Sequence, residues 1–124
     1  MSFCTVINCM DGRTQLPANE FLRNKYKVDY IDTITEAGPV RILAENHSSS
    51  LVESILKRID ISINKHKSIA IAVVTHFDCA GNPVEKEEQL KQLEPAMRFL
   101  KEKYPSTEII GLWIDSEWKT EQVA

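Results

Sequence analysis

The sequence predicts one α/β domain over residues 1–124, built in three layers: a central, mostly parallel sheet of four strands in the order 2-1-3-4, with helices on both faces. Segments of strand character alternate with segments of helical periodicity along the chain, as in right-handed β-α-β crossovers. Residues 69–75, IAIAVVT, are continuously apolar, which is typical of a parallel strand buried on both faces. The 124 residues, 43% of them hydrophobic, suffice for one ordinary core.

The first half of the chain contains two predicted strands and two predicted helices. Residues 3–8 are a short apolar run ahead of a glycine-containing loop, and they predict the first strand. Pro17 suits the first turn of a helix, where its missing N–H has no partner to lose, and apolar residues follow it at helical spacing. Residues 28–35 are rich in β-branched and aromatic side chains and predict the second strand. Residues 49–64 carry one apolar stripe and predict a long helix.

The second half repeats this alternation. The third strand, residues 69–75, is followed by a helical region that opens at Asn82, with acidic residues near its start and basic residues near its end, as the helix dipole favours. Pro95 lies inside this region, so we expect a kink or two consecutive helices. Residues 108–114 predict the fourth strand, and the polar tail from Asp115 is expected to be a short terminal helix or frayed.

The predicted strand order places two candidate functional residues together. In a sheet ordered 2-1-3-4, the first and third strands are neighbours and their crossovers leave towards opposite faces. Ligands bind such sheets in the crevice beyond the carboxyl ends of the strands at this switch point. Because Cys9 ends the first strand and His76 ends the third, we expect both side chains at that crevice.

Composition argues against several classes of function. The formal charge is −3 and no block of Lys or Arg occurs, so nucleic acid and anionic membranes are unlikely partners. No apolar stretch approaches the roughly 20 residues needed to span a bilayer, and no signal peptide is recognisable, so we expect a cytoplasmic protein. Three cysteines form an odd set in such a chain, which favours reduced thiols over a disulfide framework.

Cys9, His76 and Cys79 form a candidate metal site. Two thiolates and one imidazole suit Zn²⁺, and three protein ligands with a fourth position open are what a catalytic zinc site requires. The spacing H-x-x-C lets one loop deliver two of the ligands, although such a pair also occurs often by chance. A cysteine at a strand end is, by itself, more often a small buried residue, so the prediction depends on the convergence of all three side chains.

The motif C-x-D-x-R, present as Cys9, Asp11 and Arg13, followed later by H-x-x-C at His76 and Cys79, resembles the signature of the β-class carbonic anhydrases. The segment TEAGPV at residues 35–40 is similar to an Ala-Gly turn of that family, and the order of elements then agrees over nearly the whole chain.

The sequence also departs from that family pattern. Members of the family generally carry N-terminal helices that wrap a partner subunit, whereas this sequence begins at the first strand. The glycine that usually follows the last ligand is Ala80 here, with Gly81 after it. The resemblance therefore indicates a compact member of the family, and together with the short chain it implies a homodimer; composition already argues against nucleic acid and membrane as partners.

The resemblance implies a function and roles for five residues. It implies zinc-dependent, reversible hydration of carbon dioxide to bicarbonate, with Cys9, His76 and Cys79 as metal ligands and a zinc-bound hydroxide as the nucleophile. Asp11, paired with Arg13, would orient that hydroxide. In a closed state, Asp11 would leave Arg13 and become the fourth ligand.

Three alternative functions, and a simpler reading of the Asp11–Arg13 pair, stay open at this point. The chain could be a catalytically silent zinc-binding relative that acts through a partner protein, or it could hydrolyse carbonyl sulfide or carbon disulfide. Without a metal, Cys9 and Cys79 could form a redox pair, although they lack the Cys-x-x-Cys spacing. Asp11 and Arg13, taken without the cysteine, could be no more than a weak salt bridge in a loop.

Overall fold

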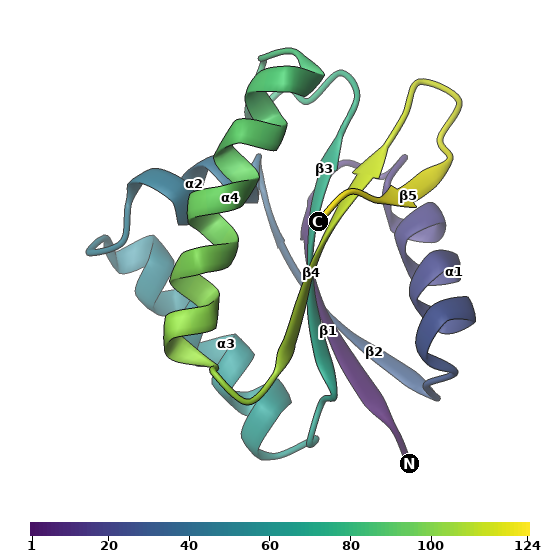
Figure 1. Ribbon diagram of the computed structural model, residues 1–124, viewed down its shortest axis with the longest axis vertical. Helices are drawn as coiled ribbons and strands as arrows, with labels where there is room; N and C mark the ends of the chain where they lie inside the picture. Colours follow the sequence, from purple (N-terminus) through teal and green to yellow (C-terminus); the bar gives the residue numbers. More distant parts are fainter.

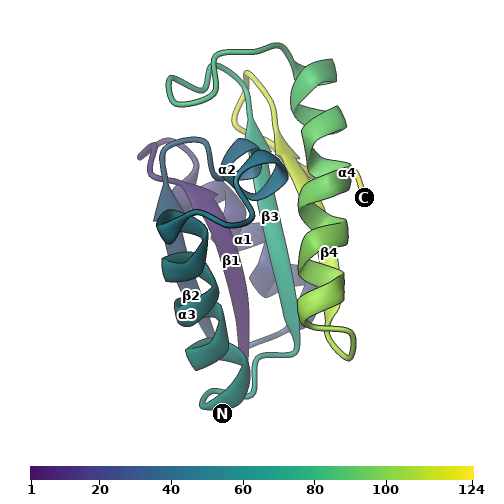
Figure 2. The same ribbon diagram turned by 90° about the vertical axis from the view of Figure 1, so that its left-hand side faces the viewer.

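The computed structural model describes residues 1–124 and contains one five-stranded sheet in the order β2-β1-β3-β4-β5. The elements in chain order are β1 (Phe3–Cys9), α1 (Gln15–Tyr26), β2 (Tyr30–Glu36), α2 (Pro39–Glu45), α3 (Ser50–Asn64), β3 (Ala70–His76), α4 (Lys86–Lys103), β4 (Glu108–Ile114) and β5 (Thr120–Gln122). The three-layer architecture is confirmed, with α1 on one face of the sheet and α2, α3 and α4 on the other (Figures 1 and 2).

The sheet has two hydrophobic cores, one on each face. The larger core lies between the sheet and helices α2, α3 and α4, and Leu43, Ile55 and Leu93 are buried in it. The smaller core lies between the sheet and α1, where Leu22 packs near Val6. All seven residues of β3 are buried, as the continuous apolar run predicts for a central strand covered on both faces.

The pairing between parallel strands is shortest at the predicted switch point. β1 and β2 are parallel over seven residue pairs, and β3 and β4 are parallel from Ala70↔Glu108 to His76↔Ile114. By contrast, β1 and β3 pair only from Thr5↔Ile71 to Ile7↔Val73. The carboxyl ends of these two central strands therefore separate beyond Ile7, which leaves room for side chains between them.

The end of the chain differs from the prediction. The tail is neither a helix nor frayed, because β5 returns antiparallel to β4. A tight turn makes this return possible: the side chain of Asp115 accepts the N–H groups of Glu117 and Lys119, and Trp118 adopts a positive φ of 62°. This fifth strand is short and polar, so it has no hydrophobic pattern that sequence reasoning could detect.

Two helices also differ from the prediction. Pro95 does not divide the helical region that was predicted to open at Asn82: this region is α4, one helix of 18 residues that begins at Lys86. Buried residues on both sides of the proline, including Leu93 and Met97, hold this helix against the sheet. Helix α2 was not predicted: Gly38, at φ 65°, allows the chain to turn, and Pro39 occupies the first helical position. None of the helices combines the length and the apolar character that crossing a bilayer requires.

Candidate metal centre

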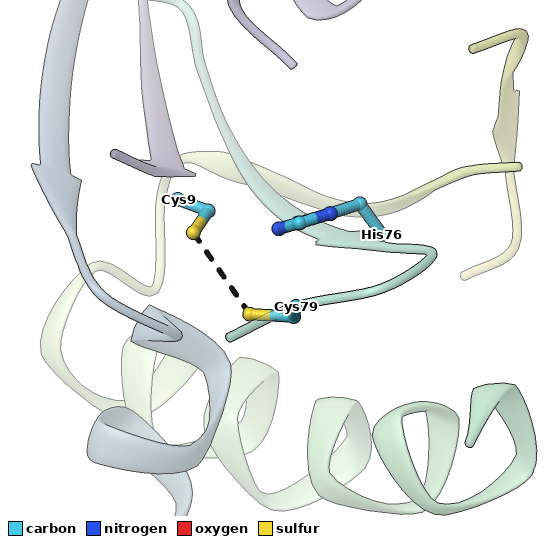
Figure 3. Close-up of side chains that lie close together, drawn as sticks. All are labelled: Cys9, His76 and Cys79. Atoms are coloured by element: carbon cyan, nitrogen blue, oxygen red, sulfur yellow. Dashed lines mark hydrogen bonds between the residues drawn. The ribbon is translucent and has the colours of Figure 1, made fainter. Parts of the chain in front are cut away.

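The structure brings together the three side chains that the sequence singles out as metal ligands. Cys9 is the last residue of β1, His76 is the last residue of β3, and Cys79 follows three residues later. Their ligand atoms all lie within 4.8 Å of one another, and the two sulfur atoms are 3.9 Å apart (Figure 3). Each of the three residues is at most 4% exposed. At these distances, the three side chains are close enough to bind one metal ion together.

The imidazole of His76 is held in the form that a metal requires. Its Nδ1 lies 2.7 Å from the carbonyl oxygen of Phe77, and because a carbonyl only accepts hydrogen bonds, Nδ1 carries the proton. The lone pair is therefore on Nε2, which is buried and has no hydrogen-bond partner. The ring points towards the two cysteines (Figure 3). A buried acceptor without a partner is costly, and a metal ion at this point would satisfy it.

Nearby hydrogen-bond donors stabilise negative charge on the sulfur atom of Cys9. The pKa of Cys9 is lowered, chiefly because the Cys79 thiol can donate to its sulfur, with further contributions from the backbone N–H groups of Gly38 and Asp11. The same hydrogen bond, together with burial, raises the pKa of Cys79. Because thiols release their protons when they bind a metal, a cation placed between these two sulfur atoms would take the place of a thiol proton.

Two glycines fix the loops that carry the site. A Cβ atom on Gly81 would lie 2.6 Å from the carbonyl carbon of Ala37, and a Cβ on Gly38 would lie 2.8 Å from the Cβ of Asn82. The turn before α2 and the loop after His76 thus lie backbone against backbone. Gly81, one position later than the resemblance implies, is the residue that permits this contact.

Asp11 and Arg13 form a close, multiply bonded pair at the edge of the site. The Nη2 and Nε atoms of Arg13 donate to the two carboxylate oxygens at 2.7 and 3.0 Å, and the backbone N–H of Arg13 donates to Oδ1 at 2.9 Å. These bonds lower the pKa of Asp11 to about 2, so the carboxylate is ionised at neutral pH. Asp11 does not belong to the cluster of ligand atoms, which consists of Cys9, His76 and Cys79.

The turn that presents Asp11 is held by the residues at the start of α1. The hydroxyl of Thr14 donates to the carbonyl oxygen of Asp11 at 2.8 Å. The side-chain amide of Gln15 donates to the carbonyl oxygens of Cys9 and Asp11 at 2.8 and 3.0 Å. Because these bonds tie the end of β1 to the following helix, the positions of Cys9 and Asp11 are fixed relative to each other.

Three residues at the site lie outside the motifs. Trp118 packs against the guanidinium group of Arg13. The backbone carbonyl oxygen of Asp78 accepts a hydrogen bond from the same group at 3.2 Å. Gln89 bonds to the backbone of His76. Only Gln89 leaves a signal in the sequence, because it is a polar residue on the apolar face of a helix, one turn before Leu93. Trp118 reaches the site through a turn that the sequence does not predict.

The fold and the site together define a class: α/β proteins with the fold of the β-carbonic anhydrases and a buried Cys-His-Cys cluster. Two solved structures of the β-carbonic anhydrase CafD of the filamentous fungus Aspergillus fumigatus, the wild type and a point mutant, each match with a TM-score of 0.63. In both, the match covers 100% of this chain and 90% of the other at 13% sequence identity, so the likeness concerns the fold.

The sequence also matches a family model over residues 1–124, and that family is described as "Putative carbonic anhydrase". The chain belongs to this family. No curated protein matches the sequence.

Proposed function

We propose that this protein is a zinc-dependent enzyme that catalyses the reversible hydration of carbon dioxide to bicarbonate. One observation supports the proposal above others: the unpartnered Nε2 of His76 is buried beside the sulfur atoms of Cys9 and Cys79. Membership of the carbonic anhydrase family supports carbon dioxide as the substrate.

The donor set supports zinc as the metal. Two sulfur atoms and one imidazole nitrogen suit a borderline-soft ion that prefers tetrahedral coordination, and carboxylate-rich sites would favour magnesium or calcium instead. A zinc ion held by three protein ligands lowers the pKa of a bound water towards about 7 and so supplies a nucleophile at neutral pH. Cys9, His76 and Cys79 would hold the ion, and Asp11, while bonded to Arg13, would leave the fourth position open to solvent.

Asp11 and Arg13 have distinct roles in this proposal. The ionised carboxylate of Asp11 can accept a hydrogen bond from a reacting hydroxyl group, and so it orients the lone pair of that group towards the substrate carbon. Arg13 keeps Asp11 ionised and keeps it away from the metal, because its Nε and Nη2 atoms occupy both carboxylate oxygens. Release of Arg13 would free Asp11 to act as the fourth ligand, which would exclude solvent and stop the reaction.

The surroundings of the site leave room for a small substrate and a partner subunit. A cavity of about 370 Å³ adjoins Cys79, and its lining includes the apolar residues Phe77 and Trp113 together with the charged residues Asp78, Glu85 and Lys86. Met10 and Phe77, which directly follow Cys9 and His76, are 65% and 45% exposed. We place a second copy of the chain over this apolar rim, as a homodimer, and light scattering on the purified protein tests it.

A reducing compartment such as the cytoplasm would keep Cys9 and Cys79 from forming a disulfide with each other.

Metal analysis followed by a stopped-flow assay tests the function. Protein purified without added metal should contain about one zinc per chain, and Cys9→Ser should lose it. The zinc-loaded protein should accelerate the hydration of carbon dioxide, measured with a pH indicator. Zinc binding without hydration would favour the silent relative, and sulfide release from carbonyl sulfide or carbon disulfide in place of hydration would favour the hydrolase.

A further inference from the structure

The side chain of Gln89 bonds to backbone groups at the end of β3 that have no partner in the neighbouring strand β1. Backbone groups of successive residues in a parallel strand point to opposite neighbours, and the N–H of Phe77 bonds to Ile114 of β4 at 2.9 Å. The N–H and C=O groups of the preceding residue, His76, therefore point towards β1. No residue of β1 pairs with them, because the pairing between β1 and β3 stops at Ile7↔Val73.

The side chain of Gln89 bonds to both of these backbone groups. Its Oε1 accepts the N–H of His76 at 3.1 Å, and its Nε2 donates to the C=O of His76 at 2.8 Å. The same Nε2 also donates to the carbonyl oxygen of Val84 at 3.3 Å. Gln89 is 1% exposed, so solvent cannot replace these bonds. The amide thus satisfies two buried backbone groups that the divergence of β1 and β3 leaves without partners.

Gln89 lies on a helix that packs tightly against the sheet. It lies in the first turn of α4, and this helix is fixed on the sheet by buried residues further along, among them Leu93 and Leu100. The amide of Gln89 therefore fixes the backbone at the end of β3 relative to α4. Cys79 lies three residues beyond His76, on the loop that follows β3, so a shift of the His76 backbone moves two of the three candidate ligands.

We propose that Gln89 is a positioning residue for the metal centre: it holds the backbone of His76 so that Nε2 faces the sulfur atoms of Cys9 and Cys79, and it thereby sets the affinity for zinc. This inference rests on the metal-binding part of the proposed function and is independent of the substrate. Groups that orient a metal ligand typically change metal affinity by about 10- to 100-fold when they are lost, and we expect a loss in this range.

Two variants and a matched control test the proposal. Gln89→Leu removes all three hydrogen bonds, whereas Gln89→Glu keeps an acceptor for the His76 N–H and loses the donor to the His76 carbonyl. The control is Ser62→Ala: Ser62 is 2% exposed and bonds to Thr5, Asp32 and Ser68 at the amino ends of the strands, away from the metal centre. It measures what the loss of a buried hydrogen-bond network alone does to the protein.

The zinc dissociation constant of each full-length protein is measured by competition with a chromophoric chelator, together with the thiolate-to-metal charge-transfer band of the cobalt-substituted form. Gln89→Leu should bind zinc about 10- to 100-fold more weakly with a shifted band, and Gln89→Glu should lie between it and the unaltered chain. Ser62→Ala should be less stable but keep its affinity and its band.

Two outcomes contradict the proposal in different ways. Unchanged zinc affinity and an unchanged band in Gln89→Leu would overturn this inference alone. If Gln89→Leu does not fold, the same two measurements on Gln89→Glu decide. Absence of zinc binding by the unaltered chain would overturn the proposed function as well.

Discussion

The guanidinium carbon of Arg13 lies 4.5 Å from the centre of the Trp118 ring, on the turn that joins β4 to β5. The same guanidinium group holds both carboxylate oxygens of Asp11. Arg13 is thus held between an acid and an aromatic ring, and the last turn of the chain contacts the Asp11–Arg13 pair beside the candidate site. A partly exposed contact of this kind contributes about 0.5–1 kcal/mol.

Removal of the Trp118 ring should weaken activity without removing the metal. In Trp118→Leu the guanidinium group loses its aromatic contact, so Arg13 is held less firmly beside Asp11. We expect kcat/KM for carbon dioxide hydration to fall by about two- to fivefold, which corresponds to the loss of one cation–π contact. Trp118→Phe keeps an aromatic face and should stay near the unaltered value. Loss of zinc from Trp118→Leu would show instead that the turn supports the ligands.

Removal of the Arg13 side chain should have a much larger effect. In Arg13→Ala, Asp11 loses its three hydrogen bonds to Arg13 side-chain nitrogens and is free to turn towards the metal. We expect hydration to be abolished while the zinc content, measured by atomic emission, stays at one per chain. Arg41→Ala is a suitable control, because Arg41 forms an exposed ion pair with Glu45, 3.1 Å apart, within one helix. Unaltered turnover in Arg13→Ala would rule out the proposed role of the pair.

The convergence of Cys9, His76 and Cys79 could be predicted from the sequence for a simple reason. The carboxyl ends of neighbouring parallel strands lie at one edge of a sheet, so the strand order alone places the residues that end β1 and β3 together. The order β2-β1-β3-β4 follows in turn from the alternation of strands with helices and from the continuous apolar run of β3. Both arguments use local patterns that a single sequence contains.

The contributions of Trp118 and Gln89 could not be predicted in this way. Trp118 reaches Arg13 because an Asp115-stabilised turn folds a polar strand back onto β4, and no hydrophobic periodicity marks such a strand. Gln89 bonds to His76 because β1 and β3 separate after three residue pairs, and the length of that pairing depends on packing between distant elements. Contacts of this kind require coordinates.

Asp11 should make the stability of the fold depend on pH in acid. Its pKa is lowered from an ordinary 3.8 to about 2 by the hydrogen bonds from Arg13. The unfolded chain therefore binds more protons than the folded chain between about pH 4 and pH 2. The contribution of this carboxylate is fully present above pH 4 and is lost as the pH falls towards 2.

The variant Asp11→Asn isolates this contribution. Its free energy of unfolding in urea should fall less steeply between pH 4 and pH 2 than that of the unaltered chain, while the two profiles run parallel above pH 5. The measurement uses metal-free protein, so that the release of zinc by acid does not contribute. Identical slopes in the two proteins below pH 4 would mean that Arg13 does not stabilise the ionised form of Asp11 in solution.

Removal of the metal should expose Cys9 and Cys79 to oxidation as a pair. Their sulfur atoms are 3.9 Å apart, and both cysteines are buried, so each is the nearest thiol to the other. After chelation, treatment with diamide should convert these two thiols into a disulfide, with the diamide reduced to a hydrazine. Cys4 is also buried, its pKa is raised to about 11 by burial, and it should stay reduced.

Thiol titration in denaturant gives the result directly. The metal-free chain should retain one of its three thiols after oxidation, and the zinc-loaded chain should retain all three. In metal-free Cys79→Ser, both remaining thiols should survive within a monomer, because the intramolecular partner of Cys9 is gone. Equal loss of thiols with and without zinc would show that the metal does not bind through these two sulfur atoms.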